Sequence, residues 1–166
     1  MFRSSFVNFH VRNRSYAMSL FTSFDINGSG LTAQRFRMDI ISENIANANT
    51  TRDEDGDPYV RKVVTFSEKG EQTPFTKIFN QKLDHYAGKG VKVTSVREDT
   101  KTQMNIVYDP SHPDADEDGY VTYPNVNIVT EMTNLIDASN AYQANATAFN
   151  ASKQIAQMGL TMGKGG

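Results

Sequence analysis

The chain has 166 residues, the size of one domain or of one small domain with extensions. Its 17 basic and 19 acidic residues give a net charge of −2, so it has no general basic field and we expect no nucleic acid partner. It contains no cysteine, which excludes disulfides, thiolate metal sites and a cysteine nucleophile, and no apolar run reaches the roughly 20 residues that membrane insertion needs.

Residues 1–17 differ from the rest of the chain. They contain three arginines and no acidic residue, whereas the remaining residues carry 14 basic against 19 acidic side chains. They also lack the continuous apolar stretch of about 7–15 residues that a cleaved secretory signal requires. We interpret residues 1–17 as a disordered extension or as the product of an upstream start codon, with Met18 as the first functional residue.

Residues 18–50 are predicted to form an N-terminal helix. Large apolar side chains recur here every seven residues. Three residues after each of them comes a member of a second set, of which half are amide and half are apolar side chains. The first set is Phe24, Leu31, Met38 and Ile45, and the second is Asn27, Gln34, Ile41 and Ala48. Gly28 and Gly30 predict a kink or a weak first turn. Asn47, Asn49 and the threonines that follow predict the end of the helix.

Residues 51–125 have a different pattern and are predicted to form a small, irregular β-rich region. Residues 59–66, 90–96 and 104–108 are rich in β-branched and aromatic side chains and are the candidate strands. Glycine, proline and acidic clusters separate them. At roughly 75 residues this region is near the lower limit for an independent core.

Residues 126–166 are predicted to form a longer C-terminal helix, with Asn125 as its N-cap. Two stripes follow the helical period on roughly opposite faces. The first consists of Ile128, Met132, Leu135, Ser139, Tyr142, Ala146 and Phe149, and the second of Ala141, Ala144, Ala148, Ala151 and Ile155. The fold class is therefore α+β, with two long terminal helices packed as a coiled-coil-like pair around a small β-rich middle.

The C-terminal helix is unusually poor in charge. Residues 126–166 carry only four charged side chains, Glu131, Asp137, Lys153 and Lys164, whereas a helix on a monomer surface normally has a charged outer face. Small, amide and large apolar residues surround it instead. This pattern favours burial on more than one side, by self-association or by assembly among similar helices. The alternative is a central helix in a small α+β domain.

An acidic segment at residues 114–119 has the first half of an EF-hand calcium loop. The twelfth position, where a bidentate Glu is needed, holds Asn125. We therefore interpret the segment as an acidic turn with Gly119 at positive φ, and keep Ca²⁺ binding as the alternative. Residues 53–58 are predicted to form a second acidic turn, and His112 is assigned to a turn.

No pattern in the chain indicates catalysis. Asp84, His85 and Tyr86 suggest a general base, but no nucleophile elbow or zinc-protease motif accompanies them, and residues 88–90 lack the spacing of a phosphate-binding loop. We expect no enzyme activity, no cofactor and no metal site.

Several motifs together resemble a known family. The segment Asn44-Ile45-Ala46-Asn47 with Thr50-Thr51, at the end of an amphipathic helix, resembles flagellar rod, hook and hook-associated axial proteins. Further segments resemble the proximal rod members of that family: residues 57–62, 109–116, 119–121, 124–127, 131–136 and 141–151. The resemblance covers residues 18–162, and its motifs occur in the family's order.

The resemblance implies a structural subunit of the bacterial flagellar basal body, located in the rod in the periplasmic space. Such proteins are exported by the flagellar type III apparatus without a cleaved signal peptide. They polymerise with copies of themselves and neighbouring rod proteins into a torque-transmitting shaft. Their terminal helices tend to be disordered before assembly. The predicted assembly contacts are Phe24, Leu31, Met38, Ile41, Ile45, Ile128, Met132, Leu135, Tyr142, Phe149 and Ile155. The rival interpretation is a small soluble Ca²⁺- or ligand-binding α+β module.

Overall fold

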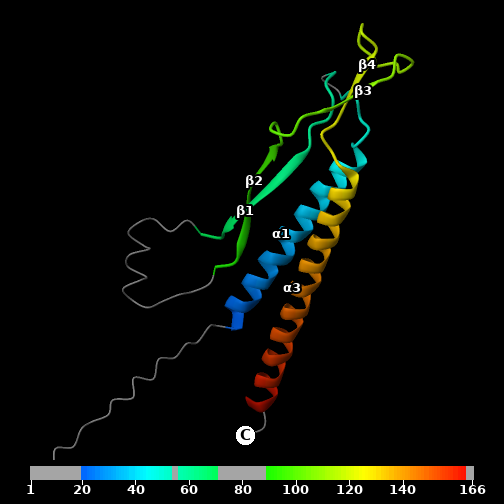
Figure 1. Ribbon diagram of the computed structural model, residues 1–166. Coiled ribbons are helices and arrows are strands. Elements are labelled where there is room, and N and C mark those ends of the chain that lie inside the picture. Colours follow the sequence, from blue (N-terminus) through cyan, green and yellow to red (C-terminus); the bar gives the residue numbers. More distant parts are fainter. Residues whose placement is uncertain (1–19, 54–55, 71–88, 164–166) are drawn as a thin grey trace, which may run out of the picture.

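The computed structural model describes residues 20–53, 56–70 and 89–163. Two long helices lie side by side, and the strands occur between them in sequence (Figure 1). The elements in order are α1 (Leu20–Ala46), β1 (Lys62–Glu68), β2 (Val91–Glu98), β3 (Asn105–Tyr108), β4 (Tyr120–Tyr123) and α3 (Ile128–Gly163). This arrangement confirms the predicted α+β fold. The predicted extension at residues 1–17 and the triplet at residues 84–86 lie outside the described residues.

The two helices run antiparallel and pack closely. Near one end, the Phe24 and Phe149 rings meet edge to face with centroids 5.1 Å apart. Further along, the backbone at Gly30 lies against Asn145, so a Cβ there would be only 2.8 Å from the Asn145 Oδ1 atom. Helix α1 continues through Gly28 and Gly30 and begins before them, so the predicted weak first turn is wrong. Packing of α1 as a whole against α3 and the first hairpin outweighs the low helix propensity of these two glycines.

The ends of both helices have identifiable caps. The Asn47 side chain donates to the Glu43 carbonyl and accepts a hydrogen bond from the Thr50 hydroxyl, which ends α1 as the sequence predicted. At the start of α3, the Thr130 amide donates to Asn127 Oδ1 over 3.0 Å. Asn127 is therefore the N-cap, and the assignment of Asn125 to this role is wrong because its side chain is engaged elsewhere.

The strands form two separate antiparallel hairpins. Strands β1 and β2 pair from Lys62 opposite Glu98 to Glu68 opposite Val91, with a register shift after Thr65, and α1 packs against both strands. Strands β3 and β4 form a second two-stranded sheet at one end of the molecule (Figure 1). The sequence predicted β1, β2 and β3 with boundaries shifted by a few residues. It did not predict β4.

Few large apolar side chains are buried within the described residues. The buried apolar residues are Ala33, Ile41, Ala48, Val121 and Ala138, and the largest side chains with almost no exposed surface are Glu131, Val121 and Asn44. The interior between α1 and α3 is therefore thin and partly polar. Within the described part of the chain, neither helix is long and apolar enough to cross a membrane.

Candidate assembly surface

A network of hydrogen bonds joins the end of α1 to the start of β1 and to α3, and we call it the polar junction. Its members are Asn44, Tyr59, Arg61, Lys62, Asp99, Asn125 and Glu131. Asn44 is 1% exposed and forms its centre. Its Nδ2 donates to the Lys62 carbonyl at 2.9 Å and to Glu131 Oε2 at 3.1 Å. Its Oδ1 accepts from the Lys62 amide and from the Tyr59 hydroxyl, each at 2.9 Å.

Glu131 and Arg61 form the buried ion pair of this junction. Glu131 is 1% exposed, and its Oε1 accepts from Arg61 Nη2 at 2.8 Å and Nε at 3.0 Å. Arg61 Nη1 also reaches Asp99 Oδ2 at 3.3 Å. A buried carboxylate is tolerated when its oxygens are hydrogen-bonded and its charge is paired, and both conditions hold here. Its position in the first turn of α3 is also favourable for a negative charge.

Asn125 connects the junction to the loop after β2. Its Oδ1 accepts from the Arg61 amide at 2.9 Å, and its Nδ2 donates to the carbonyls of Asp99 and Thr102 at 2.7 and 3.1 Å. The hydroxyl of Thr102 donates to Asp99 and lowers the pKa of that carboxyl. The junction thereby fixes the β1–β2 hairpin and both helices at one place.

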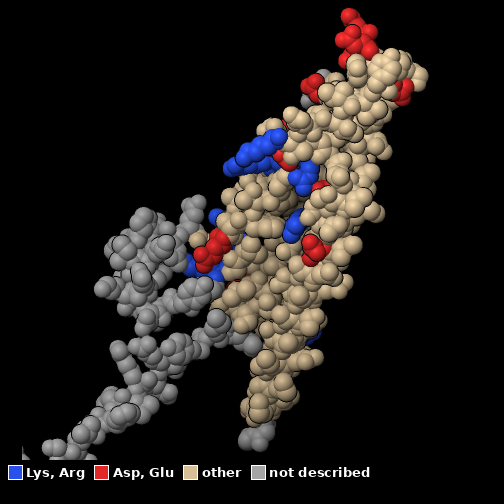
Figure 2. Space-filling view, in the orientation of Figure 1, with Lys and Arg blue, Asp and Glu red and all other residues tan. Residues whose placement is uncertain are grey.

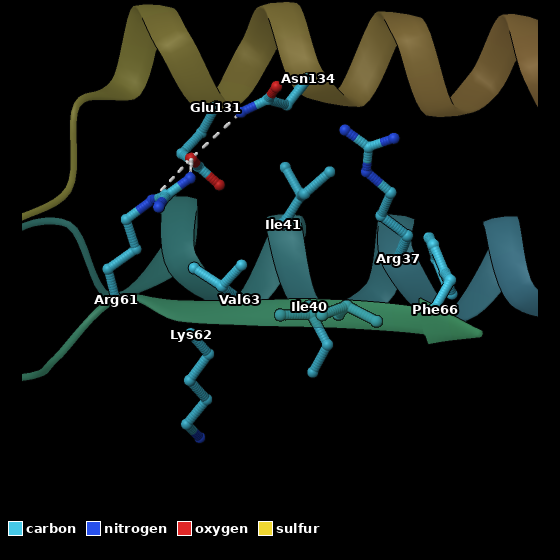
Figure 3. Close-up of a pocket in the computed structure, with 10 residues that line it drawn as sticks. Arg37, Ile40, Ile41, Arg61, Lys62, Val63, Phe66, Glu131 and Asn134 are labelled. Carbon is cyan, nitrogen blue, oxygen red and sulfur yellow. Dashed lines mark hydrogen bonds and ion pairs between the residues drawn. The ribbon is translucent and has the colours of Figure 1, made fainter. Parts of the chain in front are cut away.

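A pocket of about 300 Å³ lies beside the junction (Figure 3). Its wall combines the Arg61–Glu131 pair with Arg37, Ile41 and Phe66, and it lies between β1, α1 and α3. The pocket is open to solvent, and its lining includes no cluster of catalytic groups. Across the described residues, no group of three or more His, Asp or Glu side chains is placed to hold a metal ion.

The side of α3 that does not contact α1 carries apolar side chains in solvent, and we call it the outer face of α3. It is defined by Ile128, Val129, Met132 and Ile136, whose exposed fractions run from 42% to 75%. Glu131 is buried, so Asp137 and Lys153 are the exposed charges among the described residues of this helix. In Figure 2 the edge of the molecule that α3 forms is largely free of charged side chains. An exposed apolar face of this kind is a candidate interaction surface.

Two family models match the chain. The model described as flagella basal body rod protein matches residues 24–52, and the model described as flagellar basal body rod FlgEFG protein C-terminal matches residues 117–162. They correspond to the α1 and α3 regions of the structure.

Curated relatives match along the whole of their own length. Flagellar basal-body rod protein FlgC of Borreliella burgdorferi is 44% identical over 154 residues, which is 89% of this chain and 100% of the relative. FlgC of Bacillus subtilis is also 44% identical and FlgC of Salmonella typhimurium 39%, with the same coverage. The chain belongs to the FlgC family of flagellar basal-body rod proteins. As an FlgC protein, it is a structural subunit of the rod.

The predicted assembly contacts of this FlgC chain fall into two groups in the structure. Ile41 is buried, and the residues that are half-buried within the chain are Phe24, Leu31, Met38, Ile45, Leu135, Tyr142 and Phe149. Ile128, Met132 and Ile155 are exposed, at 42%, 54% and 60%. The predicted first stripe is therefore divided, because part of it packs toward α1 and part of it remains on the outer face.

The acidic segment of this FlgC chain is a structured turn. Gly119 has φ of +84° as predicted, and Asp116 Oδ1 accepts from the amides of Asp118 and Tyr120. Asp114 binds the Thr51 hydroxyl at 2.7 Å and the Arg52 guanidinium at 3.3 Å. The first and third positions of the would-be calcium loop are thus engaged with protein groups.

Sequence reasoning missed the polar junction. Asn44 was noticed only as part of a motif, and Glu131 only as one of the few charges in the last helix. A single acidic residue in a charge-poor helix was the available signal, because such a carboxylate requires a partner when the helix is packed.

Proposed function

We propose that this rod subunit polymerises through its two helices with copies of itself and with neighbouring rod proteins, and that the polymer transmits motor torque to the hook. The outer face of α3 carries this proposal. Its apolar residues are exposed in one chain, although the helix has few charges to keep it in water. A partner helix on this face would remove that apolar surface from water.

The energetic basis of the proposed assembly is coupled burial and ordering. Each Å² of apolar surface removed from water contributes about 25 cal/mol, offset by the cost of ordering the helices. The thin interior between α1 and α3 supplies little of this stabilisation within one chain. Neighbouring subunits would supply the remainder, which is why we expect order and assembly to occur together.

Location and export complete the proposal. We place the subunit in the periplasmic part of the basal body, delivered unfolded by the flagellar type III apparatus without a cleaved signal, and without enzyme activity. The lack of cysteine supports passage into an oxidising compartment. We also propose the division predicted from the sequence, in which residues 18–50 and 126–166 form the helical core, residues 51–125 form the outward-facing β-rich region, and residues 1–17 stand apart.

A charge on the outer face tests the proposal. Met132→Asp and Ile136→Asp each place a carboxylate on an exposed position, so the fold of the chain is retained while assembly is blocked by the cost of burying the charge. In a strain that lacks its own FlgC, we expect the unaltered chain to restore swimming and both variants to abolish it.

The matched control is Gln103→Asp, which is also at an exposed position, in the loop before β3. It should swim normally. Circular dichroism of all three variants in dilute solution, where the subunits are not assembled, checks that their helix content is equal. Swimming cells carrying Ile136→Asp, with the variant present in their basal bodies, would contradict the proposed role of this face.

A further inference from the structure

The β3–β4 hairpin presents an exposed surface with no partner in the described part of the chain. Ile106, Val107, Tyr108 and Tyr120 are 64%, 41%, 63% and 46% exposed. An isolated two-stranded hairpin is marginally stable in water unless its face packs against something. Every residue of β3 is exposed, and the Tyr108 ring packs on Tyr120 of β4, 5.2 Å between centroids, so no described element outside the hairpin covers this strand.

The same end of the molecule is strongly acidic. Residues 105–120 contain five acidic residues and no lysine or arginine. Asp116, Glu117 and Asp118 are exposed, and among the described residues neither Glu117 nor Asp118 forms an ion pair. Figure 2 shows acidic side chains gathered at the β3–β4 end. We call residues 105–108 and 116–120 together the acidic tip.

The β1–β2 hairpin has the complementary character. Residues 62–70 and 89–101 hold six basic against three acidic residues. Lys92, Arg97 and Lys101 have no ion-pair partner in the part of the chain that the structure describes. Val63, which pairs across the sheet with Arg97, is 37% exposed, so apolar surface and positive charge lie together here too. We call this surface the basic hairpin.

The acidic tip and the basic hairpin do not meet within one chain. They belong to separate sheets, and over the described ranges no contact joins the two hairpins (Figure 1). Both surfaces are exposed and opposite in charge, so a contact between different copies satisfies them together. Such a contact joins two different patches, and repeated contacts of this type form rings or helical filaments.

We propose that the acidic tip of one subunit docks on the basic hairpin of a second copy of this chain. Ion pairs from Glu117 and Asp118 to Lys92, Arg97 or Lys101 set the register, and the exposed tip side chains Tyr108 and Ile106 cover apolar surface around Val63. This inference rests on the proposed function, because it names a second contact of the same assembly. It differs from the α3 contact in surface and chemistry.

Exchanging the charges of the two surfaces tests the proposed docking, with incorporation of the subunit into the rod as the measured quantity. Glu117→Lys with Asp118→Lys, or Lys92→Glu with Arg97→Glu, should each lower incorporation into the rod by about tenfold, because like charges then face each other. Combining all four changes in one chain should restore incorporation to within about twofold, since every subunit then carries both reversed surfaces. The matched control combines Glu117→Lys and Asp118→Lys with Arg35→Glu. Its incorporation into the rod should not recover.

A zero-length carbodiimide crosslink on isolated basal bodies identifies the occupant directly. We expect Glu117 or Asp118 to be joined to Lys92 or Lys101 of another copy, and exposed Lys153 to remain unlinked to the tip. A tip joined to a different rod protein would overturn the choice of a second copy. Normal swimming of the unaltered chain, with no rescue and no tip crosslink, would refute the docking while leaving the role of α3 intact.

Discussion

Asn44 uses all the hydrogen-bonding capacity of its amide, two donors and two acceptor positions, while almost wholly buried. Because the Asn44 side chain bonds both the amide and the carbonyl of Lys62, it pairs with the backbone at the start of β1 as a neighbouring strand would. Among the other residue types only glutamine carries the same amide, and its side chain is one methylene longer. The identity of this residue is therefore set by packing geometry and not by helix propensity.

Asn44→Asp is expected to destabilise the protein by about 3 kcal/mol or more. The new oxygen would face the Lys62 carbonyl and the Glu131 carboxylate, replacing two attractive contacts by repulsive ones. Urea unfolding of the purified protein at one fixed, high concentration measures the change. Asn49→Asp, at an exposed position nearby, is the control and should shift the free energy of unfolding by less than about 0.5 kcal/mol.

Tyr59 gives the junction a dependence on alkaline pH. Burial, together with the nearby Glu43, Glu131 and Glu98 carboxylates, raises the pKa of its hydroxyl from about 10 to about 12. The contribution of the Tyr59 hydroxyl to the free energy of unfolding is complete below pH 10, where the hydroxyl is protonated in both the folded and the unfolded state. This contribution is lost between pH 10 and 12, because the hydroxyl ionises first in the unfolded state.

Tyr59→Phe should remove this part of the pH dependence. Unfolding midpoints of the two proteins, measured at intervals from about pH 8 to 12, give the comparison. The difference between the unfolding midpoints of the unaltered protein and the variant should stay constant below about pH 10 and decrease above it. Parallel curves across the whole range would show that the hydroxyl is not held protonated by the fold.

At the scale of the elements, α1 contains two glycines in different environments. A Cβ at Gly28 would meet no neighbouring atom within 4 Å, whereas Gly30 lies against Asn145, whose Nδ2 donates to the Ala141 carbonyl at 2.9 Å. Gly28 therefore lowers helix propensity without a packing role in one chain. Gly30 permits the close approach of the two helices.

Alanine at each position separates these two effects. Gly28→Ala should stabilise the protein by about 1 kcal/mol through helix propensity. Gly30→Ala should lose most of that gain, because Asn145 must rotate and give up its bond to Ala141. Urea unfolding measures both, and an equal gain from the two variants would show that the helices are not tightly packed at Gly30.

Local sequence patterns predicted most of the elements and the end of α1, but not the N-cap of α3 or the strand pairings. The two helices, β1, β2 and β3 follow from periodicity and from β-branched content. Strand β4 was missed because its four residues follow an acidic turn and lead directly to a proline. Asn125 was assigned as a cap because it precedes an apolar-periodic segment, yet long-range partners near Asp99 and Arg61 determine its role. Contacts of this range leave no local periodicity.

At the scale of the whole molecule, the described residues bury few large apolar side chains and expose many. Most of the exposed ones lie on the outer face of α3, on the acidic tip and toward the end of α3, where Ile155, Met158, Leu160 and Met162 are 55% to 78% exposed. The sequence predicted this incompleteness from the shortage of charge in the last helix. It did not predict which apolar residues pack inside the chain, because the helical period defines an apolar stripe without defining which part of it faces α1.

Helix content should therefore depend on protein concentration. We expect weak helicity in dilute solution that rises with concentration or on addition of other rod subunits, because the apolar faces become buried between chains. Circular dichroism over a dilution series measures this. A constant, high helix content with one cooperative melting transition at every dilution would instead describe a self-sufficient monomer.

The meeting of the two helix ends at the polar junction has a consequence for how rod subunits can diversify. Helix α1 ends and α3 begins at the same place, where Asn44 binds Glu131. The residues between the two helices therefore leave and re-enter the helix pair at one point. Within the described part of this stretch, β3 and β4 contact neither helix, so the β3–β4 hairpin can differ in length and shape with little effect on the helix pair.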